Sequence, residues 1–213
     1  MAYRPTALRI DRDQALRERI LASALARVAD GGFAALTMQA LAEDVGIATG
    51  SLYRHFHSKG ELAAEVFASA SQCELDALVQ TLRGAGRPAE RLVAGLQQFA
   101  ARAWHSRRLA FALIAEPVEP QVDEQRLLYR EAYAELFAEL LEEGRVAGVF
   151  RVQHSSLTAA CLVGAIGEAL VGPLSPPARA AREAGCPILS LSEVSQGLVT
   201  FCLRAVGAEE PQA

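Results

Sequence analysis

The sequence predicts an all-α protein, in which an N-terminal three-helix domain with a helix-turn-helix precedes a C-terminal helical domain. Two observations support this fold class. Apolar residues recur at three- and four-residue spacing along most of the chain, and breaks rich in Gly and Pro separate the periodic stretches. About half of the residues are apolar and aromatic residues are sparse, which is typical of a helix-rich globular protein.

The first predicted helix spans residues 13–29. Its apolar stripe recurs every fourth residue and consists of Leu16, Ile20, Ala24 and Val28. A Gly-Gly pair ends the helix, and Asp11 or Asp13 could cap its start. We expect residues 1–12, ahead of this helix, to form a flexible arm.

Residues 37–59, TMQALAEDVGIATGSLYRHFHSK, predict two short helices joined by a tight turn. Thr37 is suited to cap the first of them, and Gly46 falls where the turn requires a left-handed backbone. Ile47 and Leu52 would fix the second helix on the first. The exposed face of the second helix then carries slim or hydrogen-bonding residues, namely Thr49, Gly50, Ser51, Tyr53 and His55. Such residues suit a DNA major groove.

Three further residues extend this candidate DNA-binding surface. Thr37 could contact a phosphate from its cap position, since helix N-termini attract anions. Gln39 could contact a base, although a solvated Gln is about as plausible. For Tyr53, His55 and Lys59 we favour phosphate contacts, with a buried structural Tyr or His as the alternative. Lys59 would lie in the first turn of a long helix that a Ser58–Glu61 capping box begins.

The run GIATGSLYRHFHSKGEL, preceded by GGFAALTMQALAEDV, resembles the DNA-binding domain of the TetR-type transcriptional repressors over residues 16–67. The LYRHF core, the SK pair and the upstream GGF occur together and in order. The sequence differs from the family pattern at Ala48, where a hydroxyl residue is usual, and at Leu36, where a second Thr is usual. The resemblance implies a homodimer on a pseudo-palindromic operator in double-stranded DNA, released by a small-molecule effector.

The rest of the chain predicts further helices. Their expected bounds are 58–83, 89–104, 109–115, 122–146, 156–171 and 191–206, with a loop at 172–187. The predicted organisation is a flexible arm at 1–12, a helix-turn-helix DNA-binding domain at 13–60, a ligand-binding and dimerisation domain at 61–206, and a disordered tail at 207–213.

Two functions are expected of the C-terminal domain. An effector cavity among its central helices could be lined by Phe99, Trp104, Phe111, Tyr129 and Tyr133 as a group, although core packing is the favoured reading for any one of these aromatic residues. No cluster of charges stands out, which favours an apolar or aromatic effector. Helices 156–171 and 191–206 are expected to form a two-fold dimer interface, because two heads read a palindrome. Ordinary packing within one protomer is the alternative.

Composition narrows the class of protein further. The net charge is −4, but the first sixty residues carry +2 and the remainder −6, which fits a DNA-facing domain on an acidic body. No apolar run approaches the roughly 20 residues that cross a membrane, and the N-terminus lacks a signal core. We therefore expect a cytoplasmic protein without membrane contact. The widely spaced cysteines are expected to be buried or semi-buried thiols and predict no metal or cofactor: Cys73, Cys161, Cys186 and Cys202.

These observations predict a sequence-specific DNA-binding transcriptional regulator, in particular a repressor. Activation of transcription remains an alternative to repression, because the direction of regulation depends on where the operator lies relative to the promoter. A helical small-molecule sensor or adaptor that does not act through DNA is the alternative. An enzyme is disfavoured, since His55, His57, His105 and His154 lie in no nucleophile motif or metal spacing.

Overall fold

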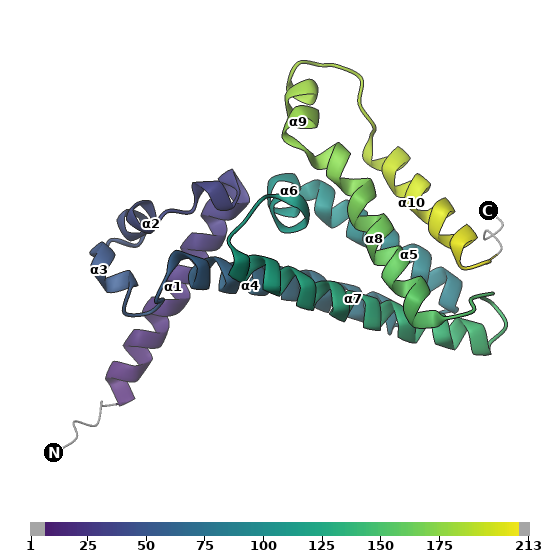
Figure 1. The fold of residues 1–213 in the computed structure, drawn as a ribbon, viewed down its shortest axis with the longest axis horizontal. Coiled ribbons are helices and arrows are strands. Elements are labelled where there is room, and N and C mark those ends of the chain that lie inside the picture. The colour runs from purple at the N-terminus through teal and green to yellow at the C-terminus, as the bar shows by residue number, and fades with distance from the viewer. Residues whose placement is uncertain (1–6, 209–213) are drawn as a thin grey trace.

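The computed structural model describes residues 7–208, with side chains from residue 11 onward, and contains ten α-helices and one short 3-10 helix in that part of the chain (Figure 1). Their bounds are α1 Ala7–Gly31, η1 Phe33–Ala35, α2 Met38–Val45, α3 Thr49–Leu52, α4 Lys59–Leu82, α5 Pro88–His105, α6 Arg107–Ala115, α7 Pro120–Val146, α8 Ser155–Leu174, α9 Pro176–Glu183 and α10 Leu191–Ala205. No strand occurs among these residues, and the all-α prediction is confirmed.

Both ends of the chain differ from their prediction where they are described. Helix α1 begins at Ala7, so residues 7–12 belong to the helix and not to a flexible arm. Asp11 and Asp13 accordingly lie inside α1 and cannot cap it. Residues 1–6 and 209–213 lie outside the described part of the chain, whereas Ala208 still donates its backbone N–H to the carbonyl of Leu203 at 3.0 Å.

The predicted loop at 172–187 is mostly helical. Helix α8 continues to Leu174, and α9 follows at once. Ser175 caps α9 by accepting a hydrogen bond from the Ala178 N–H at 3.3 Å, and Pro176 occupies the first turn. Proline suits the first turn of a helix, because the N–H that it lacks would have no partner within the helix there and its φ is already helical. The prolines that suggested a loop therefore begin a helix.

The head consists of α1, η1, α2, α3 and the first turns of α4, and it has an apolar core of its own. Ile20, Phe33 and Leu52 are buried in that core. Leu62 and Phe67 of α4 belong to the same cluster, as do residues of α6 and α7. The predicted boundary at residue 60 therefore divides a continuous helix, because α4 begins in the head and ends in the body.

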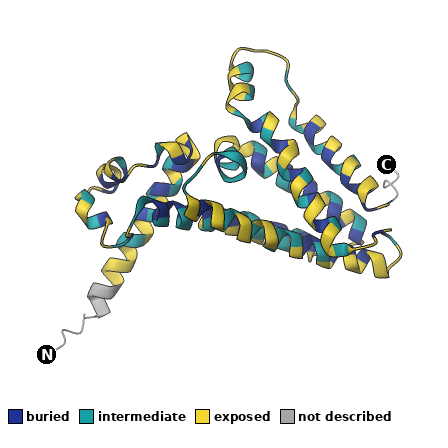
Figure 2. Ribbon diagram, viewed as in Figure 1, coloured by how far each residue is buried: buried dark blue, intermediate teal, exposed yellow. Residues whose placement is uncertain are grey.

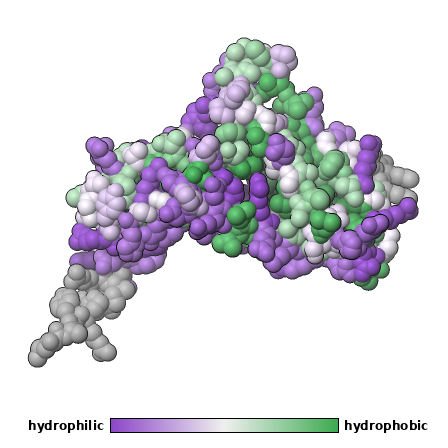
Figure 3. Space-filling view, in the orientation of Figure 1, coloured by the Kyte–Doolittle hydropathy of each residue, from purple (hydrophilic) through white to green (hydrophobic). Residues whose placement is uncertain are grey.

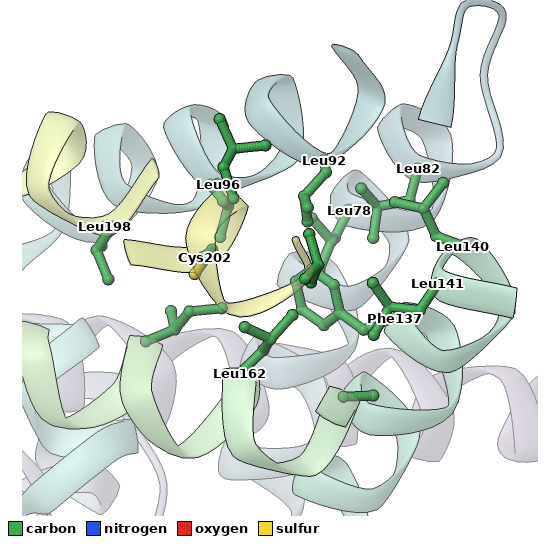
Figure 4. Close-up of a cluster of buried hydrophobic side chains, with 14 of the residues drawn as sticks. Leu78, Leu82, Leu92, Leu96, Phe137, Leu140, Leu141, Leu162, Leu198 and Cys202 are labelled. Carbon is green, nitrogen blue, oxygen red and sulfur yellow. The ribbon is translucent and has the colours of Figure 1, made fainter. Parts of the chain in front are cut away.

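The body consists of the remainder of α4 and helices α5 to α10 around a second apolar cluster. Figure 4 shows side chains from different helices converging there, including Leu82 of α4, Leu96 of α5, Phe137 of α7, Leu162 of α8 and Cys202 of α10. Helix α4 packs along α7, α7 packs on α8, and α10 packs on α5. Helices α4, α5, α7, α8 and α10 thus share one core, and α9 packs on α8.

Helix α8 is strongly apolar, although less than a third of its apolar stretch is buried. An 18-residue stretch of this 20-residue helix has a mean hydropathy of 1.7, and only 28% of that stretch is buried. By length and composition alone it could cross a membrane, so the expectation that no apolar run approaches that length is wrong. Exposed faces of α8 and α10 are visible in Figure 2, and apolar surface lies over α8 in Figure 3.

Three of the four cysteines are exposed, against the expectation of buried or semi-buried thiols. Cys73, Cys161 and Cys186 reach the surface, and Cys202 alone is buried. Burial raises the pKa of the Cys202 thiol to about 12. No group of His, Cys, Asp and Glu residues suited to a metal ion occurs in the described part of the chain.

Candidate DNA-binding head and ligand cavity

The turn between α2 and α3 has the predicted geometry. The Thr37 hydroxyl accepts a hydrogen bond from the Ala40 N–H at 3.3 Å and caps α2. Gly46 ends α2 with φ 74°, in the left-handed region. A Cβ at Gly46 would meet no atom within 4 Å, so its backbone angle, and not lack of space, requires glycine there.

Helix α3 is a short helix held from beneath. Leu52 and Phe56 are fully buried and anchor it on the core of the head. Ala48 occupies the N-cap position and supplies no side-chain hydrogen bond, and Gly50 faces open space. Tyr53, which ends the helix, is 50% exposed. The outer surface of α3 is thus free of large side chains up to Tyr53.

The predicted DNA-contact residues lie at the start of α2, on and just after α3, and at the start of α4, and they differ in exposure. Thr37, Gln39, Gly50 and Tyr53 are exposed, and the half-buried members of the set are Thr49, Ser51, His55 and Lys59. The exposed Arg54 was not among the predicted residues, although its cationic side chain donates to the Ser51 hydroxyl at 2.8 Å. Its position between two predicted contacts could have identified it.

Lys59 is not a free cation. Its Nζ forms an ion pair with Glu119 Oε1 at 2.8 Å, across the junction between the head and the body. Burial raises the pKa of Glu119, but the hydrogen bond from Lys59 and a backbone hydrogen bond outweigh it and leave that pKa lowered. A phosphate contact by Lys59 therefore competes with Glu119.

The capping box predicted at the start of α4 is half formed. The Ser58 hydroxyl accepts the Glu61 N–H at 3.1 Å, as predicted. Glu61 does not bond back to Ser58, because its carboxylate accepts the His57 backbone N–H at 2.6 Å and contacts the His57 ring at 2.9 Å. The hydrogen bond from the His57 backbone is the main cause of the lowered pKa of Glu61.

The loop between α6 and α7 holds the head a second time. The Glu116 carboxylate accepts the backbone N–H groups of Phe33 and Ala34 at 3.0 and 3.1 Å. Arg126 fixes this loop by donating to the carbonyls of Leu113 and Glu116 at 3.0 and 2.9 Å. Burial lowers the pKa of Arg126. The α6–α7 loop thereby contacts η1, directly after the end of α1.

A cavity of about 120 Å³ lies among helices α4 to α8. Phe99, Tyr129 and Tyr133 line it, as predicted from the sequence. Trp104 and Phe111 do not line this cavity. The Trp104 ring packs against two arginine side chains, and Phe111 lines a separate groove beside α9. Helical periodicity identifies the apolar face of a helix but not which neighbour each aromatic residue meets, so these two assignments were wrong.

The cavity wall also carries charge that the sequence did not indicate. Arg102 donates to the Glu74 carboxylate at 2.6 and 2.9 Å, and both residues line the cavity together with Arg126 and Arg130. The Tyr133 hydroxyl donates to the carbonyl of Ser71 at 3.2 Å, and burial raises the pKa of Tyr133. The cavity can therefore accept an apolar molecule and offers it polar partners on α4, α5 and α7.

Comparison with known proteins agrees with this division into head and body. Residues 20–66 match the model of the bacterial regulatory proteins of the tetR family, and residues 85–169 match that of a tetracyclin repressor-like C-terminal domain. The HTH-type transcriptional repressor KstR2 of Mycolicibacterium smegmatis is 29% identical over 140 residues, which are 63% of this chain and 67% of that protein.

Two solved structures share the whole arrangement. FadR of Bacillus subtilis, in complex with stearoyl-CoA, has a TM-score of 0.71 at 14% identity and covers 89% of this chain and 98% of its own. The reduced form of NemR of E. coli has a TM-score of 0.70 at 18% identity, with coverage of 91% and 98%. At these identities the likeness establishes the fold.

The matches to the head and to the body define the class of the protein as a bacterial helix-turn-helix transcriptional regulator. Within this class the chain belongs to the TetR family, as the resemblance over residues 16–67 implied. It is accordingly a DNA-binding regulator and not an enzyme.

Proposed function

We propose that the protein is a dimeric repressor that binds a pseudo-palindromic operator and leaves it when a small molecule enters the cavity. The observation that carries this proposal is the course of α4. This helix begins at Lys59, beside the candidate DNA-contact residues, and its residues Phe67, Ser71 and Glu74 line the cavity. A ligand that shifts this wall also shifts the head.

The DNA contacts in this proposal come from α2 and α3. Thr37 and Tyr53 supply hydroxyl groups for phosphates, and Gly50 lets the backbone approach a base edge. Gln39 donates to the Glu43 carboxylate at 3.3 Å on the exposed side of α2 and can exchange this partner for a base. Arg54 adds a cation to the same end of the head.

The proposed dimer interface lies on α8 and α10. Leu157 and Phe201 are 63% and 54% exposed, which leaves large apolar side chains in water on both helices. Gly164 and Gly197 have open space beyond them, so a partner helix can approach closely. A two-fold axis here would set two heads side by side, and half-sites one helical turn of DNA apart, about 34–36 Å, suit such a dimer.

The effector in this proposal is a mainly apolar small molecule with a polar group. Apolar side chains make up most of the cavity wall, and the Glu74–Arg102 pair offers a polar end. The ligand makes more contacts in one arrangement of α4, α6 and α7 than in the other, so it favours that arrangement. DNA affinity then falls according to the difference between the ligand's affinities for the two arrangements. We infer that the protein acts in the cytoplasm, where its operator lies.

Selection of genomic DNA fragments on the immobilised full-length protein tests the proposal. We expect the retained fragments to share an inverted repeat with half-site centres about one helical turn apart. Fragments without a common repeat, retained equally by a Tyr53→Ala variant, would show that α3 does not read DNA. A protein that retains no DNA at any salt concentration would support the sensor or adaptor alternative.

A further inference from the structure

A groove rich in arginine lies between the head and α9, apart from the proposed ligand cavity. It has a volume of about 680 Å³ and is bordered by the end of α1, the start of α6 and the helix α9. Four arginines line it, and they come from two helices: Arg107 and Arg108 of α6, and Arg179 and Arg182 of α9. Two carboxylates, Glu116 and Glu183, also border it.

The positive charge of this groove is not neutralised within the described residues. None of the four arginines forms an ion pair with a carboxylate there. Arg108 and Arg182 donate instead to the neutral backbone carbonyls of Asp30 and Pro173. The charge of Glu116 is engaged by two backbone N–H groups of the head. Four arginines therefore face two carboxylates, one of which is already occupied.

Two of these cations lie near one aromatic ring, that of Trp104. The guanidinium groups of Arg107 and Arg182 lie 5.3 and 5.0 Å from the centre of the Trp104 ring. The Nε of Arg182 is buried and has no hydrogen-bond partner. Burial lowers the pKa of Arg182, and the positive charge of Arg107 lowers it further. An anion between the two arginines would relieve this repulsion.

Helix α6 adds backbone donors to the groove. It begins at Arg107, and its N-cap residue Ser106, which lines the groove, makes no side-chain cap bond to the first turn. Planar guanidinium groups and free helix N–H groups together suit phosphate oxygens. Ser106 also lines the ligand cavity, so the groove adjoins a site for small molecules.

We propose that this groove binds the phosphate groups of a small molecule, in particular a diphosphate, between α6 and α9. An anion there would draw Arg107 and Arg179 together and compete with the Asp30 carbonyl for Arg108. Because Asp30 lies near the end of α1, an anion in the groove would alter how the head packs on the body. The site is distinct from the proposed cavity and does not require that the proposed function be correct.

Trp104, the single tryptophan of the chain, contacts two of the arginines that line the groove and can therefore report on its occupancy. We would titrate the full-length protein with pyrophosphate at constant ionic strength and follow tryptophan emission. We expect a saturable change that chloride does not produce. The Arg107→Gln/Arg179→Gln variant should bind at least about tenfold more weakly, because it loses two charge-assisted contacts to phosphate. The control Arg151→Gln removes an exposed arginine elsewhere and should bind like the original protein.

Unchanged thermal midpoints of both variants without ligand would show that they fold, and calorimetry would then measure their affinity independently of the fluorophore. The proposal is overturned by emission that does not saturate, or by equal affinity of the double variant and the original protein. Saturable binding of pyrophosphate without operator binding would support the groove while refuting the proposed repressor.

Discussion

The carboxylate of Glu116 accepts the backbone N–H of Phe33 at 3.0 Å, and this bond fastens the head to a loop of the body 83 residues further along the chain. The same carboxylate accepts the Ala34 N–H at 3.1 Å. A loop of the body thus satisfies the backbone donors that begin η1. In the proposed repressor, this contact and the Lys59–Glu119 ion pair are the two polar connections through which the α6–α7 loop can orient the head.

Replacement of Glu116 by Ala should loosen the head. Two hydrogen bonds to a charged group are lost, which should cost about 2–3 kcal/mol of local stability. Hydrogen exchange measured by mass spectrometry should therefore become faster over residues 29–36. The control Glu124→Ala, on an exposed part of α7, should leave this exchange unchanged. Equal protection in both variants would mean that Glu116 does not hold the head.

Replacement of Phe201 by Asp should separate the proposed dimer. Dimer formation would bury the new carboxylate of each protomer in the interface. The dissociation constant of the dimer should therefore rise more than about 100-fold. Analytical ultracentrifugation measures this change. Leu127→Asp is the matched control, because Leu127 is 66% exposed on α7, away from the proposed interface. A Phe201→Asp protein that stays dimeric would place the interface elsewhere.

The cysteines should differ in reactivity. Cys202 is buried and its thiol has a pKa of about 12, so at pH 8.5 it forms far less thiolate than an ordinary cysteine. Iodoacetamide should modify Cys73 and Cys186 in the native protein, and Cys202 only after unfolding. Cys161 is exposed in the isolated protomer, but it lies on the proposed dimer face. It should therefore react fully only in the Phe201→Asp variant. Mass spectrometry of peptides distinguishes the four sites, and early modification of Cys202 would contradict this order.

The sequence predicted the features of the head that depend on neighbouring residues. The Thr37 cap, the left-handed Gly46 and the apolar Leu52 that fixes the second helix follow from spacing within one short stretch, and all three predictions are confirmed. Glu116 could not be found in this way, because its partners lie about 80 residues earlier in the chain. An isolated acidic residue beside a proline gives no sign of such a contact.

The body was harder to predict for a related reason. Phe99 and Tyr133 line the cavity, and their rings meet edge to face at 6.0 Å between centroids. Trp104 lies on the same helix as Phe99 but faces α9, a helix that the prolines had suggested was a loop. Once α9 was missed, neither the position of Trp104 nor the arginine groove beside it could be anticipated.

The central claim is that α2 and α3 bind DNA as part of a dimeric repressor. Fluorescence anisotropy on one retained DNA fragment, at several salt concentrations, tests it most directly. We predict that affinity falls steeply as salt rises, and that Tyr53→Ala weakens binding about 100-fold at each concentration, since a dimer loses two contacts to charged phosphates. Equal affinity of the variant and the original protein, or binding that salt does not weaken, would contradict the claim.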